Sequence, residues 1–222
     1  MALASWWHND PLTTLNPLPN FSVKLAHDNK ELARLNKLSE NEVETRKQTR
    51  HRPYVGYMDG VPVTYGWVAT RSASIGELDL NFALPANERY LWDFATLPEW
   101  QGQGLYPRLL QATIQAEAAE RYWIIYAPEN SPSGAGIQKA GFQIVGQLSF
   151  RADGAVGLIP IDSATFEKAG VGAVRLGVDL FDDGLSPCWG CIGQVVCNCK
   201  INPELCTCAI EVHSHARQLM AL

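Results

Sequence analysis

Apolar and polar positions first alternate over residues 21–25, where Phe-Ser-Val-Lys-Leu predicts a short strand. Asp28 then precedes leucines that recur at helical spacing, and it can cap a helix. Ser39, followed three residues later by Glu42, resembles the capping box of a second helix that ends near Arg50. The pattern therefore predicts one strand followed by two helices.

In the middle of the chain, apolar residues recur at every second position. Two alternating segments flank Asp59-Gly60, which is a strong signal for a hairpin turn. Residues 77–82 alternate cleanly and residues 89–97 are rich in aromatic side chains, so both predict strands. A helix with an apolar inner face begins at Leu105 and ends at about residue 120. The continuous apolar run at 122–127 is typical of a strand buried on both faces.

A short helix is predicted to follow Asn130 and to stop at Gly141, and residues 142–150 and 155–161 predict a last strand pair. The order of elements is then β-α-α-β-β-β-β-α-β-α-β-β. Residues 1–19 are rich in Pro, Asn and Trp and show no period, so they predict an arm that lies on the surface.

Composition narrows the class of protein. The chain has 222 residues, of which 46% are apolar and 18% charged, as expected of a globular protein with a proper core. Its net charge is -5, and glutamates upstream balance the densest basic run, residues 46–52, so this run predicts a solvated helix face and no nucleic-acid site. No apolar run approaches the ~20 residues of a membrane span, and the first residues lack the pattern of a signal peptide. We therefore expect a cytoplasmic location and no membrane partner.

The segment from Leu97 to Leu110 carries the clearest chemical signal. A strand ends, the loop Gln101-Gly102-Gln103-Gly104 follows, and a helix begins at once. A helix N-terminus offers unpaired N–H groups and a partial positive charge, and glycines let an anion approach the backbone closely. Taken alone, such a loop is more often a plain turn; together with its flanking elements it predicts a pyrophosphate site.

Two signatures, in this order and with a buried strand between them, resemble those of the GNAT superfamily of N-acetyltransferases. Gln101 and Gly104 match Gln/Arg-x-x-Gly-x-Gly/Ala, although Tyr106 replaces the final small residue. Asn130 and the run Lys139-Ala-Gly-Phe resemble the Asn…Tyr-x-Lys-x-Gly-Phe segment, with Ile137 at the place of the tyrosine. The resemblance implies an α/β (α+β) fold, in which helices flank a mixed central sheet that is splayed at the acetyl-CoA site.

The resemblance also implies that acetyl-CoA lies in the splay and that its acetyl group passes directly to a primary amine of a small molecule or a protein. The residues that it places at the cofactor are Ala95, Thr96, Leu97, Gln101, Gly102, Gln103, Gly104, Leu105, Tyr106, Asn130 and Ser133.

The amine must lose a proton to attack, so a carboxylate or an ordered water has to accept it. Asp93 lies on a strand expected to be central, where an unpaired carboxylate is costly, and it matches a position that is often acidic in the family. A paired core carboxylate is the alternative for Asp93. Glu77 and Asp79 are further bases, although strand-end carboxylates usually face water. Because Ile137 cannot donate a proton, Tyr126 or a water is expected to protonate the leaving thiolate, with simple packing as the alternative for Tyr126.

All six cysteines lie between positions 188 and 208. A reducing compartment disfavours disulfides, and the spacings Cys-x-x-Cys and Cys-x-Cys, followed by His-x-His, offer eight ligands, enough for two tetrahedral Zn²⁺ sites. Disulfides and a three-metal or iron–sulfur cluster are the alternatives. The predicted ligands are Cys188, Cys191, Cys197, Cys199, Cys206, Cys208, His213 and His215. Exposed histidines of a terminal helix or strand are the alternative for the last two.

These observations divide the chain into a surface arm at 1–19, an acetyltransferase domain at 20–162, a linker at 163–187 and a metal-stapled segment at 188–222. We expect the last segment to dock a protein partner, to form a homodimer or to sense redox state. The leading hypothesis for the whole is an acetyl-CoA-dependent N-acetyltransferase. The alternative is a weakly catalytic acyl-CoA-binding module that acts as a metal-dependent interaction or redox-sensing protein.

Overall fold

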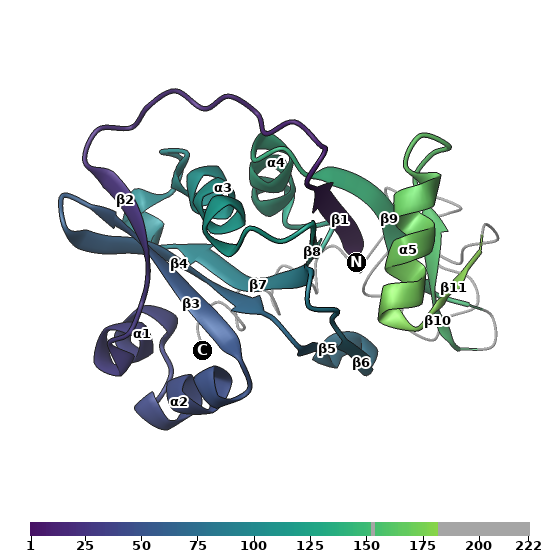
Figure 1. Ribbon diagram of the computed structural model, residues 1–222, viewed down its shortest axis with the longest axis horizontal. Coiled ribbons are helices and arrows are strands. Elements are labelled where there is room, and N and C mark those ends of the chain that lie inside the picture. The colour runs from purple at the N-terminus through teal and green to yellow at the C-terminus, as the bar shows by residue number, and fades with distance from the viewer. Residues whose placement is uncertain (152–153, 182–222) are drawn as a thin grey trace, which may run out of the picture.

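The computed structural model describes residues 1–151 and 154–181. A nine-stranded mixed sheet, in the order β11-β10-β9-β1-β8-β7-β4-β3-β2, forms its centre, and β5 pairs with β6 in a separate hairpin (Figure 1). The strands are β1 (Ala2–Trp7), β2 (Phe21–Leu25), β3 (His51–Met58), β4 (Val61–Ala69), β5 (Ser72–Ile75), β6 (Leu80–Ala83), β7 (Glu88–Thr96), β8 (Arg121–Tyr126), β9 (Gln143–Phe150), β10 (Val156–Pro160) and β11 (Asp179–Leu180). The helices are α1 (Asn29–Asn36), α2 (Glu40–Gln48), α3 (Leu105–Glu117), α4 (Ser131–Lys139) and α5 (Phe166–Leu176), with short 3₁₀ turns η1 (Gly76–Leu78) and η2 (Pro98–Trp100).

The local signals confirm the predicted helices and the hairpin. Asp28 caps α1 by accepting hydrogen bonds from two backbone N–H groups of its first turn, and Ser39 with Glu42 forms the capping box of α2. Asp59 and Gly60 both have positive φ in the turn between β3 and β4, as tight hairpin turns require. These short-range patterns correctly fix where the chain turns and where the helices begin.

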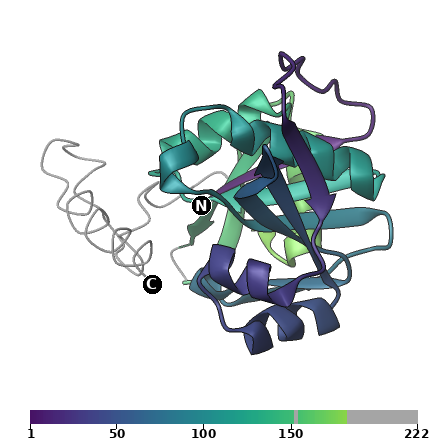
Figure 2. The same ribbon diagram turned by 90° about the vertical axis from the view of Figure 1, so that its left-hand side faces the viewer.

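The sheet separates two helical layers, which Figure 2 shows on opposite faces. Residues of α3 and α4 pack against one face, with Tyr54 and Val68 of the sheet. Residues of α1 and α2 pack against the other face, with the next side chains along, Val55 and Trp67. Neighbouring residues of a strand point to opposite faces, so each strand contributes to both cores. A ligand bound between two strands of the sheet would therefore contact α3 and α4 on one side and α1 and α2 on the other.

The predicted surface arm at 1–19 is wrong for its first part. Residues 2–7 form β1, which lies inside the sheet and pairs antiparallel with β8 and β9. This strand is covered on both faces, so its side chains, apolar except for Ser5, show no alternation. The remaining residues do cross the surface of α3, where Asn16 and Thr13 accept hydrogen bonds through their carbonyls from Arg108 and Gln111.

The predicted linker at 163–187 is also wrong where the structure describes it. Residues 166–176 form α5, which packs on β9 and β10, and β11 extends the sheet beyond β10. Buried Glu88, at the start of β7, accepts hydrogen bonds from Arg175 of α5 at 2.8 and 3.0 Å and also binds Arg121 and Trp123. This helix is therefore held to the core by a buried ion pair.

Two smaller points complete the fold. Residues 77–82 do not form one strand, because the 3₁₀ turn η1 occupies their first part and β6 begins at Leu80. In the part of the chain that the structure describes, no helix is long and apolar enough to cross a membrane.

Candidate functional site

The centre of the sheet opens between β7 and β8. These parallel strands pair from Glu88 and Arg121 up to Leu91 and Ile124, and no pairing between them follows in the described chain. A β-bulge lies directly after this point: Trp92 and Ala95 of β7 face Trp67 and Tyr65 of β4, so β7 carries one extra residue. Bulges bend a strand and re-aim its side chains. The bulge and the opening coincide, so β7 turns away from β8 there.

The bulge changes the direction in which the Asp93 side chain points. Its φ of 51° lies in the left-handed region, which is uncommon for a residue with a side chain, although Asp tolerates it better than most. The next residue, Phe94, points to the opposite face and covers Gly66, where a Cβ would meet its ring at 2.4 Å. Strained backbone of this kind is often found where a side chain has a functional position.

The predicted pyrophosphate loop follows the end of β7. Gly102 and Gly104 have φ of 76° and 70°, and the loop is exposed apart from the half-buried Gly104. Gln101 donates a hydrogen bond from its side chain to the Thr96 carbonyl at 3.1 Å, which ties the loop to β7. Gly104 is the N-cap of α3, and no side chain caps this end. The first N–H groups of α3 are therefore available for an anion.

The remaining residues predicted at the cofactor lie around this loop. Ala95 and Thr96 are on β7 at the opening, whereas both backbone groups of Leu97 are already bonded, its N–H to the Val63 carbonyl and its carbonyl to the Trp100 N–H. Leu105 is buried and anchors the start of α3. The structure thus brings the loop and the end of β7 together, and it leaves Leu97 without a free backbone group.

The space between α3 and α4 is filled by two tyrosines that pack on glycines. Tyr106 lies against Gly136, where a Cβ would be 2.5 Å from its ring, and its hydroxyl is 3.2 Å from the Ser133 hydroxyl. Tyr126, at the end of β8, lies against Gly134, where a Cβ would be 2.9 Å from its hydroxyl oxygen. The large residue at 106 is therefore accommodated by a missing side chain on α4 and points away from the loop.

The proton-donating ability of these groups follows from their surroundings. Burial raises the pKa of Tyr106 to about 12 and also raises the pKa of Tyr126, so both phenols stay protonated at neutral pH. Ile137, at the place of the family's tyrosine, is fully buried in the core between α3 and α4. Asn130 caps α4 by accepting a hydrogen bond from the Ser133 N–H at 3.2 Å.

On the opposite face, Asp93 meets an arginine held on two indole rings. The Arg46 guanidinium donates a hydrogen bond to the Asp93 carboxylate at 2.5 Å and stacks 4.4 Å from the Trp92 ring and 5.1 Å from the Trp67 ring. Trp67 is fully buried, and its Nε1 donates to the Asn36 side chain at 2.6 Å. The side chains of Arg46 and Asp93 are 21% and 33% exposed, so both are partly accessible to solvent.

Burial and this arginine act on Asp93 in opposite directions. Burial raises the pKa of Asp93, and the Arg46 hydrogen bond and charge oppose the rise without cancelling it. Burial also raises the pKa of the neighbouring Tyr65 to about 12, with a further contribution from the Asp93 charge. Burial lowers the pKa of His51, which packs edge-on against Trp92 at 5.1 Å. Asp93 is thus the carboxylate at the opening whose proton affinity is increased, as expected of a base.

The other predicted bases lie elsewhere. Glu77 and Asp79 are exposed in and just after η1, the turn that joins β5 to β6, and Asp79 has a φ of 50°. They belong to the separate hairpin and not to a strand of the central sheet. Of the predicted carboxylates, Asp93 is therefore the one that the structure places on β7 at the opening.

The family assignment follows from comparison with known proteins. A model of the acetyltransferase (GNAT) family matches residues 22–142, more than half of the chain, from β2 through the loop to the end of α4. The chain belongs to the acetyltransferase (GNAT) family. The opened sheet and the glycine loop described above lie within the matched residues and form part of its GNAT core.

Solved structures with a similar fold include several acetyltransferases at low identity. A GCN5-related N-acetyltransferase from Kribbella flavida is 15% identical, with a TM-score of 0.45, over 64% of this chain and 53% of that chain. The ribosomal-protein-S18-alanine N-acetyltransferase from Escherichia coli is 15% identical, with a TM-score of 0.46, over 59% and 81%. IAA acetyltransferase from Bacillus cereus is 16% identical, with a TM-score of 0.44, over 59% and 81%. The GNAT chain thus spans about half the length of the first of these proteins. Among curated proteins no match is found.

The predicted zinc ligands cannot be placed on this GNAT core. Cys188, Cys191, Cys197, Cys199, Cys206, Cys208, His213 and His215 all lie outside the described residues. Within residues 1–151 and 154–181, no group of three or more His, Cys, Asp or Glu side chains is arranged to hold a metal ion.

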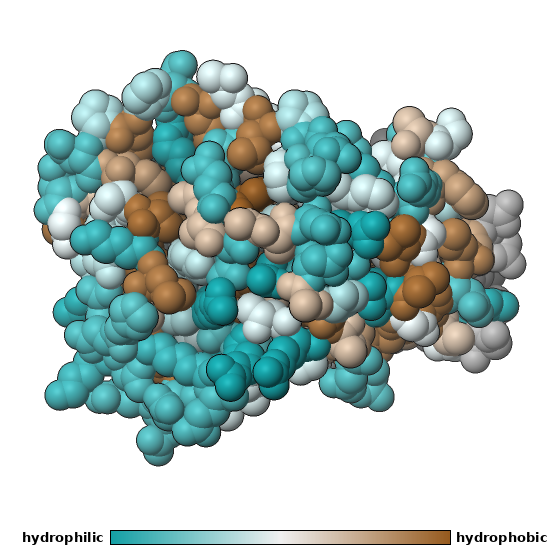
Figure 3. Space-filling model, in the orientation of Figure 1, coloured by the Kyte–Doolittle hydropathy of each residue, from teal (hydrophilic) through white to brown (hydrophobic). Residues whose placement is uncertain are grey.

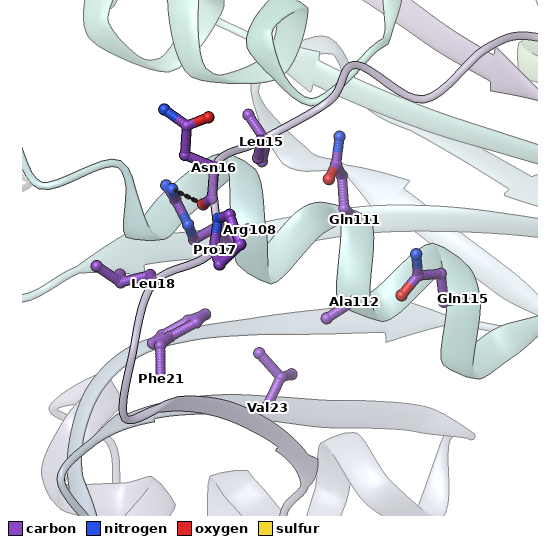
Figure 4. Close-up of a pocket in the computed structure, with 10 residues that line it drawn as sticks. All are labelled: Leu15, Asn16, Pro17, Leu18, Phe21, Val23, Arg108, Gln111, Ala112 and Gln115. Atoms are coloured by element: carbon purple, nitrogen blue, oxygen red, sulfur yellow. Dashed lines mark hydrogen bonds between the residues drawn. The ribbon is translucent and has the colours of Figure 1, made fainter.

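A surface groove of about 260 Å³ lies beside α3, under the segment that joins β1 to β2 (Figure 4). In Figure 3 apolar side chains gather around this region, near β2 and α3. The groove is lined by Leu15, Asn16, Pro17, Leu18, Phe21, Val23, Arg108, Gln111, Ala112 and Gln115. Arg108 connects it to the loop, because its guanidinium donates to the Gly104 carbonyl at 2.7 Å and to the Asn16 carbonyl at 2.6 Å.

Sequence reasoning missed two residues of the site. Arg46 belongs to the basic run that predicts a solvated helix face, yet it stacks on Trp92 and binds Asp93. Arg108 lies one turn into α3 and puts a positive charge beside the loop. The position of Arg108, four residues after Gly104, is a signal that the sequence offers. The partners of Arg46 are 21, 46 and 47 residues away, and no local pattern connects them.

Proposed function

We propose that this chain transfers an acetyl group from acetyl-CoA to a primary amine by direct attack, at the opening between β7 and β8. The observation that carries the proposal is the coincidence of three features at one place. The sheet opens after Leu91, the uncapped N-terminus of α3 follows an exposed glycine loop, and the bulge changes the direction in which Asp93 points. The first two features suit a thioester cofactor with a pyrophosphate, and the third suits the removal of a proton.

The loop would hold the pyrophosphate through backbone groups. Gly104, with a φ of 70°, leaves the N–H groups of Leu105 and Tyr106 without a side-chain cap, and Pro107 contributes no donor. Arg108 adds charge at the same end of the helix. The unpaired edge of β7 can hydrogen-bond the pantetheine arm as a neighbouring strand would. Acetyl-CoA supplies the activated acyl group, and the protein positions it.

Asp93 accepts the proton of the attacking amine, directly or through a water. The amine nitrogen forms a bond to the acetyl carbonyl carbon, the carbon–sulfur bond breaks, and the amine proton goes to the Asp93 carboxylate. The raised pKa of Asp93 increases its proton affinity. A backbone N–H of β7 would stabilise the developing oxyanion.

Tyr126 donates a proton to the leaving thiolate in this proposal. Ile137 cannot do so, and Tyr126 presents its hydroxyl to the first turns of α4 from the end of β8. No hydrogen bond of the Tyr126 hydroxyl to another described residue is found, whereas the Tyr106 hydroxyl contacts Ser133. Both lie on the face of the sheet that carries α3 and α4. Tyr126 is therefore the freer of the two donors.

Release of CoA thiol in the presence of simple primary amines tests the proposal. We expect thiol release that requires both acetyl-CoA and amine, together with the mass of an acetylated product. Release that proceeds equally without any amine would show a hydrolase, and no release with any amine would refute the proposal.

Zinc in the cysteine-rich segment stays a prediction of the sequence. Native mass spectrometry of the full chain is expected to find a mass increase of about two zinc ions, since six thiolates and two imidazoles can fill two tetrahedral sites. Free thiols without bound metal would contradict it, and chelation should leave the GNAT core folded because its described core contains no cysteine.

A further inference from the structure

We infer that Arg46 and Asp93 form a charge-recognition site for the acceptor, and that the acceptor carries a carboxylate next to its reacting amine, as an α-amino acid does. The inference rests on the proposed function, because it assigns the acceptor of that same site. It concerns the face of the sheet that carries α1 and α2.

Arg46 is fixed in place by the packing of α2. Val43 is the buried residue of this helix, and Arg46 follows it by one turn on the same side. The guanidinium carbon then lies over the rings of Trp92 and Trp67, 4.4 and 5.1 Å from their centroids, and this packing restricts its movement. Stacking on aromatic faces is a common way to hold arginine, and it leaves the edge of the guanidinium free for hydrogen bonds.

That edge has unused donors. A guanidinium has five N–H groups, and within the described chain the recorded hydrogen bond of Arg46 is the one from Nη1 to Asp93. The side chain is 21% exposed, so part of it is accessible from solvent. A planar arginine with free donors fits a carboxylate, which it can bind through two parallel hydrogen bonds.

The charge pattern also selects among amines. Arg46 places a positive charge next to the proposed base, so an acceptor that carries only positive charge is repelled there. The Tyr65 phenol and the His51 imidazole also lie beside the pair; burial raises the pKa of the first and lowers that of the second, which keeps both neutral at pH 7. Glu42 lies one turn before Arg46 on α2, where hydrogen bonds with Ser39 and the Arg46 charge lower the pKa of its carboxyl. An acceptor with adjacent ammonium and carboxylate groups complements the pair, with its ammonium on Asp93 and its carboxylate on Arg46.

Matched substrates test the inference. Wild-type enzyme, Arg46→Gln and Arg50→Gln are compared on α-amino acids, on the corresponding amides and on the corresponding decarboxylated amines. Arg50 is an exposed residue of the same basic run, outside the site, so it controls for the loss of one charge. Circular dichroism melting confirms folding of each variant, and Arg46→Lys provides a second variant that keeps the charge and loses the planar fork.

The measured quantity is the ratio of kcat/KM for an acid to that for its amide. We expect wild type to prefer acids by about 10- to 100-fold, the range of a charge-assisted hydrogen bond. Arg46→Gln should reduce the ratio to near one, mainly through KM, Arg46→Lys should lie between, and Arg50→Gln should match wild type. Equal use of amides by wild type, or an unchanged ratio in Arg46→Gln, would overturn the inference while leaving the proposed transfer intact. Absence of thiol release with every amine would instead refute the proposed function, and this inference with it.

Discussion

The two faces of the sheet at the opening between β7 and β8 are built in different ways. On the face of α3 and α4, the glycine loop and the first turn of α3 form one continuous segment, and its functional groups are mostly backbone N–H groups. On the face of α1 and α2, Arg46, Trp67, Trp92 and Asp93 come from α2, β4 and β7, and their functional groups are side chains. A site made of contiguous backbone is visible in a sequence, whereas a site assembled by tertiary contacts is not.

The largest effect on catalysis is expected from Asp93, on the face of the sheet that carries α1 and α2. Asp93→Asn removes the proposed proton acceptor and keeps its shape, so kcat should fall by about 10² to 10⁴-fold, the usual contribution of a positioned base. Affinity for acetyl-CoA should stay within a factor of two or so of wild type, since the loop is unaltered. Steady-state kinetics measures the first and titration the second; unchanged turnover would remove Asp93 from the mechanism.

A buried carboxylate away from the opening should behave in the opposite way. Glu88 is fully buried, with bonds from Arg175, Arg121 and Trp123, so Glu88→Gln is expected to lower the free energy of unfolding by about 3–5 kcal/mol. Chemical denaturation measures this. The exposed Glu120→Gln serves as the control and should change stability by about 0.5 kcal/mol or less. A small effect at Glu88 would mean that α5 is not held as described.

The role of the glycine loop in binding acetyl-CoA is tested by one added methyl group. Gly104→Ala places a Cβ 2.7 Å from the Arg108 guanidinium at a φ of 70°, so the Arg108 side chain must move or the strained loop must shift, and acetyl-CoA binding should weaken roughly tenfold or more. Gly177→Ala is the matched control, because Gly177 also has a φ of 70° but lies after α5, with open space around a Cβ. Both should lose about 1–2 kcal/mol of stability from left-handed strain. Equal cofactor affinity in the two variants would argue against the loop as the binding site.

The smallest effect is expected from the tyrosines between α3 and α4. Tyr126→Phe should lower kcat by less than the ~10²-fold typical of a positioned acid, because a thiolate leaves readily without one. Tyr106→Phe is the control, since its hydroxyl contacts Ser133. A larger loss of kcat in the Tyr106 variant would transfer the proton-donating role to that residue.

Much of the fold could be predicted from local sequence patterns, for physical reasons. Helix caps at Asp28 and Ser39, the Asp59-Gly60 turn and the loop at residues 101–104 are each determined by interactions within a few residues. Such interactions leave a pattern in the sequence. The order of helices and strands through the middle of the chain followed from them.

The errors concern segments whose structure depends on distant partners. Residues 2–7 have no alternation, because β8 and β9 cover both edges of β1 and helices cover both its faces, so composition alone suggested an arm. Residues 166–176 are predicted as part of a linker, although they carry an amphipathic pattern; the bonds that hold this helix reach back to Glu88. The Arg46–Asp93 pair joins residues 47 apart and was hidden in a run of charges that is usually solvated.

The most direct test of the account is a calorimetric titration of acetyl-CoA into wild type, Asp93→Asn and Gly104→Ala. We predict saturable binding of one acetyl-CoA to wild type, similar binding to Asp93→Asn and clearly weaker binding to Gly104→Ala. That outcome would show that acetyl-CoA binding depends on the glycine loop and not on Asp93. No binding to wild type at high micromolar concentrations would contradict the account.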